Sequence, residues 1–131
     1  MALLQTVIEN LAEGVIISDL NGSLVLWNEV GLAMHGFENV KEWSYHLPEL
    51  QNIFELSTLE GNFIPFEEWP LPRIIRGETV TNLDVLIRRS DCDWERVFSY
   101  SGTCVQEPGG RLLAVMTTID IGERFAAQNK I

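Results

Sequence analysis

Residues 10–37 read NLAEGVIISDLNGSLVLWNEVGLAMHGF, and they carry the clearest structural pattern in the chain. Two short runs rich in β-branched and apolar residues, 14–19 and 23–28, predict a pair of strands. Between them, residues 19–22 (DLNG) have the composition of a tight turn, because Asn-Gly readily adopts positive φ angles. At Asn28 the apolar spacing changes to that of a helix, which the side chain of Asn28 can cap. The stretch therefore predicts a β-hairpin followed directly by a helix.

Helices are expected on both sides of this stretch. Upstream, residues 2–12 place apolar side chains at i, i+3, i+4 and i+7, which predicts an N-terminal amphipathic helix. Downstream, residues 38–65 contain Pro and Gly breakers and are expected to form short helical turns joined by loops. Residues 66–77 (FEEWPLPRIIRG) predict a further helix, and the prolines favour a start at Pro70 or later.

The last third of the chain is predicted to be β-structure. Residues 80–89, 94–106 and 111–121 are rich in Val, Ile, Thr, Tyr, Phe and Trp, and turn residues separate them. A short helical tail is expected over 122–131. Two early strands and three late ones, with helices between them, predict an α+β domain built on a five-stranded antiparallel sheet with helices on one face.

Composition limits the classes of function. The 131 residues fit one domain, and the net charge of −10 argues against binding a nucleic-acid backbone. Residues 1–72 hold eleven acidic residues and one basic residue, so they carry the entire net charge. The helices predicted in this part of the chain cover the sheet, and their negative charge should repel anionic ligands. The chain has only two cysteines, and their spacing fits no zinc site. We therefore expect a protein of the reducing cytoplasm without a disulfide framework. No stretch predicts a signal peptide or a membrane span, although a parent protein could be membrane-anchored.

Three stretches in this order resemble the PAS domain, the sensory-box family of signal-transduction proteins. They are residues 10–37, with the Asp19–Gly22 turn and the Gly36-Phe37 end of the helix, residues 67–80 (EEWPLPRIIRGETV) and residues 120–124 (DIGER). The resemblance implies a regulatory sensor module fused to an effector beyond Ile131, such as a sensor histidine kinase or diguanylate cyclase. It divides the chain into an N-terminal helix, 1–13, a PAS core, 14–121, and the start of a helical connector, 122–131.

The resemblance also implies roles for both ends of the chain. The N-terminal helix of the family often pairs with its mate, which predicts a homodimer; the residues of that interface would be Leu4, Val7, Ile8 and Leu11. The relay to the effector would use Asp120, Gly122 and Arg124. Gly122 stands where the family usually has a threonine that caps the outgoing helix, so we expect Asp120 to cap that helix instead.

A cavity between the sheet and its helical cover is a second expectation, beside the alternative of a solid core. The candidate pocket has apolar residues from the helices and the sheet and polar anchors from the late strands; its residues are Met34, Leu71, Ile74, Ile75, Val85, Ser99, Tyr100, Met116 and Thr117. Such a pocket would hold a small neutral or apolar molecule. A third possible function is a protein-interaction module without a ligand pocket.

Catalysis is not expected, because the chain has no nucleotide-binding loop, no hydrolase motif and no metal-binding motif. The sequence requires no cofactor, and the identity of any cofactor is unknown. A noncovalent haem or flavin sensor is the alternative function. However, neither Cys92 nor Cys104 lies in the cysteine-containing motif of flavin-binding photoreceptors. Residues 66–77 also lack the axial histidine that haem sensors of this family usually carry on that helix. His35 and His46 are expected to pack in the fold or to face solvent.

Overall fold

A computed structural model describes residues 12–37 and 47–128. Within these residues the predicted strands and helices occur in the expected order, and two further short strands form between them. They are β1 (Gly14–Asp19), β2 (Leu24–Trp27), α2 (Glu29–Met34), the 3-10 helix η2 (Leu47–Asn52), β3 (Phe54–Ser57), β4 (Phe63–Ile64), the 3-10 helix η3 (Phe66–Glu68), α3 (Pro70–Ile75), β5 (Val80–Arg89), β6 (Glu95–Gln106), β7 (Leu112–Asp120) and α4 (Gly122–Gln128). Residues 2–11 of the predicted N-terminal helix, with its four dimer residues, and His46 lie outside the described residues.

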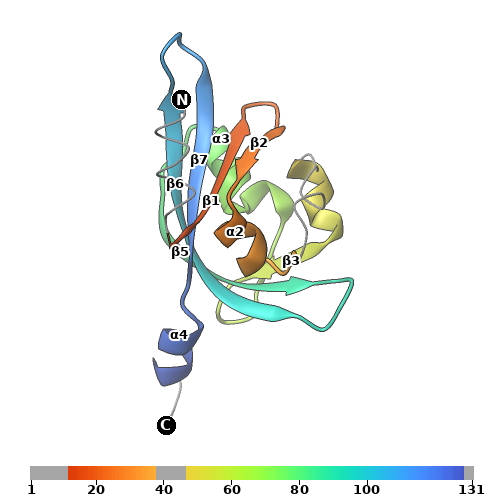
Figure 1. Ribbon diagram of the computed structural model, residues 1–131. Coiled ribbons are helices and arrows are strands. Elements are labelled where there is room, and N and C mark those ends of the chain that lie inside the picture. Colours follow the sequence, from red (N-terminus) through yellow and green to blue (C-terminus); the bar gives the residue numbers. More distant parts are fainter. Residues whose placement is uncertain (1–11, 38–46, 129–131) are drawn as a thin grey trace.

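One antiparallel sheet organises the described part of the chain. Its strand order is β2-β1-β7-β6-β5-β3-β4, so the strand pair that begins the domain lies beside the strand that ends it (Figure 1). The sheet has seven strands where the sequence predicted five, because β3 and β4 form within the segment that was expected to contain turns and loops. The α+β class, the antiparallel sheet and the placement of the five predicted strands are confirmed.

The first hairpin and the following helix form as the local sequence predicts. The Asp19 carboxylate accepts hydrogen bonds from the backbone N–H groups of Asn21 and Ser23, both at 2.9 Å, and Gly22 has φ of +88°. The Asn28 side-chain oxygen accepts from the N–H of Gly31 at 2.9 Å and from the N–H of Val15 at 2.8 Å. Asn28 therefore caps α2 and joins that cap to β1.

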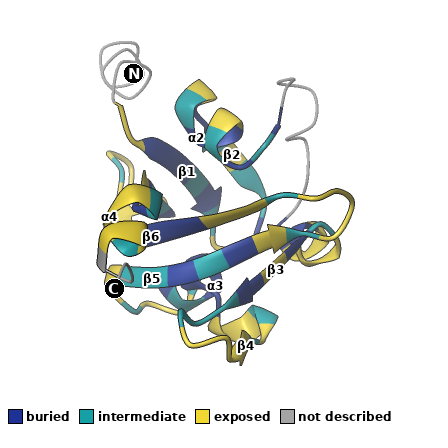
Figure 2. Ribbon diagram, turned by 90° about the horizontal axis from the view of Figure 1, so that it is seen from below, coloured by how far each residue is buried: buried dark blue, intermediate teal, exposed yellow. Residues whose placement is uncertain are grey.

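The core lies between one face of the sheet and the helices α2, η2 and α3. The middle parts of the strands are buried and the turns at their ends are exposed (Figure 2). Period-2 alternation operates as expected in β5, where Val85 and Ile87 are buried and the residues beside them are not. Helix α3 begins at Pro70, as the prolines predicted.

Gly102 lets α3 approach the sheet closely. A Cβ atom at this position of β6 would lie 2.6 Å from Cδ1 of Ile74 on α3, and it would also overlap the carbonyl oxygen of Val115 on β7. The side chain of Ile74 is fully buried at this contact. The missing side chain thus sets the depth at which α3 lies on β6, and with it the space left between α3 and the sheet.

Candidate functional site

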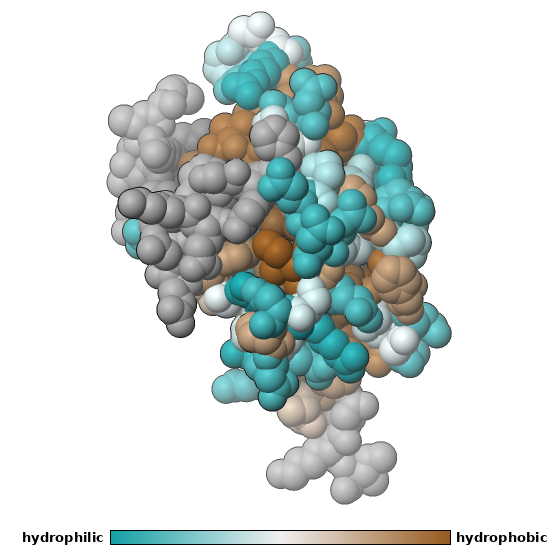
Figure 3. All heavy atoms as spheres, turned by 90° about the vertical axis from the view of Figure 1, so that its right-hand side faces the viewer, coloured by the Kyte–Doolittle hydropathy of each residue, from teal (hydrophilic) through white to brown (hydrophobic). Residues whose placement is uncertain are grey.

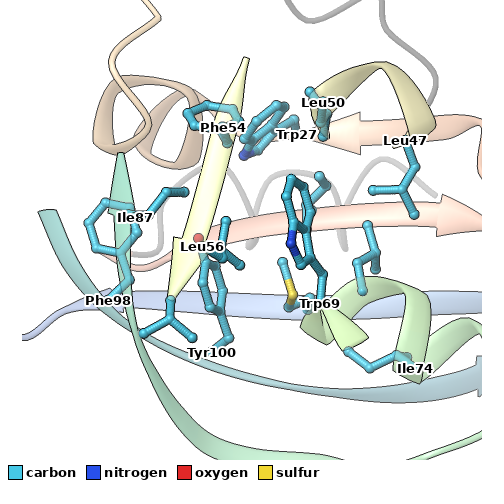
Figure 4. Packing of buried hydrophobic residues seen from close by; sticks show 14 of the residues in the cluster. Trp27, Leu47, Leu50, Phe54, Leu56, Trp69, Ile74, Ile87, Phe98 and Tyr100 are labelled. Atoms are coloured by element: carbon cyan, nitrogen blue, oxygen red, sulfur yellow. The ribbon is translucent and has the colours of Figure 1, made fainter. Parts of the chain in front are cut away.

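A cavity of about 40 Å³ lies between the sheet and its helical cover. Side chains from β1, β2, β3, β5, β6 and β7 form one side, and side chains from η2 and the start of α3 form the other. Most of these side chains belong to the buried hydrophobic cluster, part of which is drawn in Figure 4. The cavity therefore joins elements from both halves of the sequence, including the two strands that precede α4.

Three of the nine expected pocket residues line this cavity: Leu71, Tyr100 and Met116. Ile74 and Val85 are fully buried elsewhere in the core. Met34 and Ile75 are partly buried against the core, and Ile75 contributes to a separate surface groove near Leu20 and Pro72.

Ser99 and Thr117, the two other expected anchors, lie on the opposite face of the sheet. Each is directly adjacent in its strand to a residue that lines the cavity, Tyr100 and Met116 respectively. Since successive side chains of a strand point to opposite faces, neighbours cannot both face one cavity. Thr117 instead donates from its hydroxyl to the carbonyl oxygen of Ser101 at 3.3 Å. The period-2 rule would have separated these pairs from the sequence alone.

His35, which the sequence did not select for the pocket, lies in the cavity wall. It follows the last turn of α2 and is 5% exposed. Its Nδ1 atom is 2.8 Å from the carbonyl oxygen of Gly31, and its Nε2 atom is 2.9 Å from the hydroxyl of Tyr100. The expectation that this histidine packs within the fold is thus fulfilled, and its hydrogen bond to Tyr100 adds a polar group to the wall.

Burial sets the protonation states of this pair. Desolvation lowers the pKa of His35 to about 4, although the hydrogen bond to the Gly31 carbonyl partly opposes this shift. Desolvation also raises the pKa of Tyr100 above its ordinary value. Both side chains are therefore neutral near pH 7, and they meet among the rings of Trp27, Phe54 and Phe98.

Aromatic and apolar side chains form the remaining wall. Trp27, Phe54 and Trp69 all line the cavity, and the indole N–H of Trp69 donates to the carbonyl oxygen of Ile64 at 3.1 Å. Figure 4 shows Trp69, the residue just before α3, and Tyr100 of β6 extending into the same cluster. No Lys, Arg, Asp or Glu is among the described residues that line the cavity, so it suits neutral molecules.

The size of the cavity tests the haem and flavin alternative. One water molecule needs roughly 10–15 Å³ of such a space, so 40 Å³ accommodates about three waters or a comparably small molecule. A haem or flavin ring system does not fit without displacement of the surrounding core. No cysteine lines the cavity within the described residues: Cys92 is exposed, and Cys104 donates to the carbonyl oxygen of Ile74.

Arg89 connects the end of β5 with the end of α2, close to the cavity. Its guanidinium donates to the carbonyl oxygens of Gly36 and His35, and it lies over the rings of Phe37 and Phe54. Hydrogen bonds from Arg89 lower the pKa of the neighbouring Asp91 to about 2. The arginine thus ties the segment that carries His35 to the sheet.

The expected relay residues lie where β7 leads into α4. The Asp120 carboxylate accepts a hydrogen bond from the N–H of Gly122, the first residue of α4, at 2.8 Å. Arg124 forms an ion pair with Asp84 of β5 at 3.9 Å. The N–H of Ile121 donates to the carbonyl oxygen of Val97 on β6 at 3.0 Å. The start of α4 is therefore attached to both β5 and β6.

The surface of the described residues carries further apolar features. Figure 3 shows the side of the molecule on which η2 and β3 lie in Figure 1, where apolar side chains appear in a hollow surrounded by hydrophilic ones. Among the described residues, Phe63 is the most exposed of the large apolar side chains, at 66%. No helix in the described ranges is long and apolar enough to cross a membrane. Within 12–37 and 47–128, no three potential metal ligands lie together.

Comparisons with known proteins agree with this architecture. A family model described as "PAS domain" matches residues 2–70. The comparison with curated proteins found no match. Among solved structures, the chain is similar to the PAS domain of an HTR-like protein from Haloarcula marismortui, with TM-score 0.61, 16% identity and coverage of 92% of this chain and 90% of that one.

Two further solved structures share the fold. A PAS domain from a two-component sensor histidine kinase gives TM-score 0.60 at 15% identity, with 91% of this chain and 94% of that chain covered. An RNA-binding light-oxygen-voltage receptor gives TM-score 0.64 at 16% identity, and the aligned region covers 97% of this chain and 35% of the receptor. With the family match over residues 2–70, these findings show that the chain belongs to the PAS family of sensory domains found in signalling proteins.

Proposed function

We propose that this chain is the sensory input domain of a larger signalling protein, and that its input is a small neutral molecule held in the cavity beneath η2 and α3. The position of this cavity carries the proposal. It touches both the helical cover and the strands β6 and β7, and β7 leads directly into α4. A molecule that displaces the cover relative to the sheet therefore acts on elements next to the outgoing helix.

Charge supports a neutral input. The net charge of −10 lies within residues 1–72, which include α2, η2 and the start of α3. An anion approaching this cover would be repelled, and no positively charged side chain lines the cavity in the described ranges to compensate. Transfer of a charged molecule into an apolar cavity without a partner is strongly unfavourable.

The output would pass through the start of α4. In this proposal Asp120 and Gly122 hold the first turn of α4 and Arg124 connects it to Asp84 of β5, so movement of β5 or β6 changes the direction of the helix. An effector domain would follow Ile131. The proposal keeps the division into 1–13, 14–121 and 122–131, a homodimer through Leu4, Val7, Ile8 and Leu11, and a cytoplasmic location. It assigns no catalysis to this domain.

The test is ligand-dependent stabilisation of the purified chain. A library of small neutral metabolites would be screened by thermal unfolding. A ligand present at a hundred times its Kd stabilises the folded state by about 2.7 kcal/mol and raises Tm measurably. Leu50→Phe enlarges a side chain of the cavity wall, and Leu112→Phe makes the same change at an exposed position of β7.

We expect any stabilisation to be lost in Leu50→Phe and retained in Leu112→Phe. An equal response of both variants would show that the ligand binds elsewhere. A folded wild-type chain that no compound stabilises, and that releases no bound molecule in denaturing mass spectrometry, would contradict a ligand-sensing role.

A further inference from the structure

The hydrogen bonds of His35 fix the positions of two protons in the cavity wall. The Gly31 carbonyl can only accept, so Nδ1 of His35, 2.8 Å away, must carry a proton. The neutral ring then has a lone pair at Nε2, and this atom accepts from the Tyr100 hydroxyl at 2.9 Å. The proton of Tyr100 thus points to His35, and that of His35 points to the Gly31 carbonyl oxygen within α2.

The surroundings of the ring support this neutral, single-tautomer arrangement. The rings of Trp27, Phe54 and Phe98 lie with their centroids 5.1, 5.8 and 5.0 Å from that of His35. None of these three rings carries a negative charge that could pair with a protonated imidazole. A protonated imidazole would therefore be buried without a counter-ion, which is unfavourable.

The Tyr100 oxygen consequently presents only acceptor capacity to the cavity. A phenolic hydroxyl has one donor, here used for His35, and lone pairs that can accept a further hydrogen bond. Tyr100 lines the cavity, and its side chain extends from β6 into the cluster (Figure 4). A ligand carbonyl or ether oxygen would gain nothing from this atom, whereas a ligand O–H or N–H group would.

We propose that the cavity selects small neutral molecules that carry a hydroxyl or N–H donor, and that the Tyr100 oxygen, oriented by His35, is the group that recognises this donor. This inference rests on the ligand-sensing function proposed above. The body of the ligand would contact the aromatic and apolar wall, which includes Trp27, Phe54 and Trp69. With 40 Å³ available, the ligand is a compact molecule of a few non-hydrogen atoms, such as a short-chain alcohol or amide.

The opposite polarity is disfavoured. If Tyr100 donated to a ligand, it would have to leave Nε2 of His35 without a partner inside a ring of aromatic side chains. A buried acceptor that loses its hydrogen bond is costly. The arrangement thus discriminates between donors and acceptors of the same size and shape.

Two isomeric probes test the inference directly. 1-Propanol and methoxyethane have the same atoms, but only the alcohol can donate a hydrogen bond. Each is titrated into the wild-type chain, with methyl groups of Ile87, Leu71 and Met116 observed by NMR. The same titrations are made with Tyr100→Phe, which removes only the hydroxyl, and with Ser99→Ala, which removes a hydroxyl from the adjacent residue on the other face of the sheet.

We expect the wild type and Ser99→Ala to bind 1-propanol at least five-fold more tightly than methoxyethane. Tyr100→Phe should lose this preference, with the affinity for methoxyethane unchanged. In parallel, long-range ¹H–¹⁵N spectra of the histidine rings, assigned with His35→Gln, should show His35 as the neutral Nδ1–H tautomer at pH 7.

Equal affinities of the wild type for the two probes would overturn the inference and leave the ligand-sensing function standing. A charged or Nε2-protonated His35 would also overturn it. If neither probe nor pressurised xenon perturbs the cavity methyl groups, both the inference and the proposed function fail. Should Tyr100→Phe not fold, the comparison of the two probes on the wild type and the tautomer of His35 still decide the matter.

Discussion

The guanidinium Nη1 of Arg89, on the last residue of β5, lies 2.8 Å from the carbonyl oxygen of Gly36, just beyond α2. The two residues are 53 positions apart in the sequence. This hydrogen bond joins the segment that carries His35 to the strand that supports the cavity. The same guanidinium forms an ion pair with Asp91. The Arg89 side chain is only 10% exposed, so it is largely shielded from solvent.

The first prediction concerns this arginine. Arg89→Met should destabilise the fold by about 2 kcal/mol, because the partly buried carbonyl of Gly36 loses a charged hydrogen-bond partner. Arg88→Met is the matched control: Arg88 pairs with Glu95 at the surface, with both side chains about half exposed, and such pairs contribute about 0–1 kcal/mol. Urea unfolding of both variants measures the difference. Equal losses would show that the Gly36 contact adds nothing.

The second prediction is a pH dependence that originates at His35. In the unfolded chain this residue takes up a proton near pH 6.5, whereas in the folded chain it does so at about pH 4. Between these values the unfolded state binds more protons, so stability should fall as the pH is lowered from 6.5 to 4, by about 3 kcal/mol at most. His35→Gln removes this titration.

Urea unfolding at pH 7, 6 and 5 checks this expectation. The free energy of unfolding should decrease more steeply for the wild type than for His35→Gln, because other groups titrate in both chains alike. Parallel pH profiles would show that His35 is not buried in its neutral form.

The third prediction concerns the cap of α2. Asn28→Ala should cost about 3 kcal/mol, because it removes a helix cap and leaves the buried N–H of Val15 without its acceptor. Asn21→Ala, at an exposed position of the β1–β2 turn, should change stability by less than about 0.5 kcal/mol. Chemical denaturation compares the two. A small effect of Asn28→Ala would mean that water replaces both hydrogen bonds.

The fourth prediction tests the close contact of α3 with the sheet. Gly102→Ala introduces a Cβ within 2.9 Å of the Met116 backbone, which cannot move aside as a flexible side chain would. We expect a loss of about 2–3 kcal/mol from overpacking. Thr103→Ala on the following, exposed residue serves as control. A well-folded Gly102→Ala variant of unchanged Tm would show that β7 and Ile74 of α3 can both move away from the added methyl group, and that the close contact is not required.

Local sequence signals predicted the elements that depend on local chemistry. The Asp19–Gly22 turn, the cap at Asn28 and the start of α3 at Pro70 are all satisfied by groups within a few residues, and each was predicted. The strands β3 and β4 were missed. They contain four and two residues, too few for a periodic pattern, and β3 forms because it pairs with the distant β5.

The candidate site depended on longer-range placement. Tyr100, Leu71 and Met116 were selected from the sequence and do line one cavity, but His35 was regarded as a packing residue. No local pattern shows that the residue after α2 meets a hydroxyl 65 positions away. By contrast, strand alternation predicts the face of the sheet to which Ser99 and Thr117 point, once Tyr100 and Met116 are known to face the cavity.

The family, the order of the predicted elements and the acidic character of the helical cover follow from the sequence, because turns, caps, periodicity and charge are properties of neighbouring residues. The small cavity, the hydrogen bond between His35 and Tyr100 in its wall, and the contact of Arg89 with the end of α2 become visible in the folded molecule alone. These features arise from side chains that meet across the sheet, and their positions depend on how closely the helices can pack on it at residues such as Gly102.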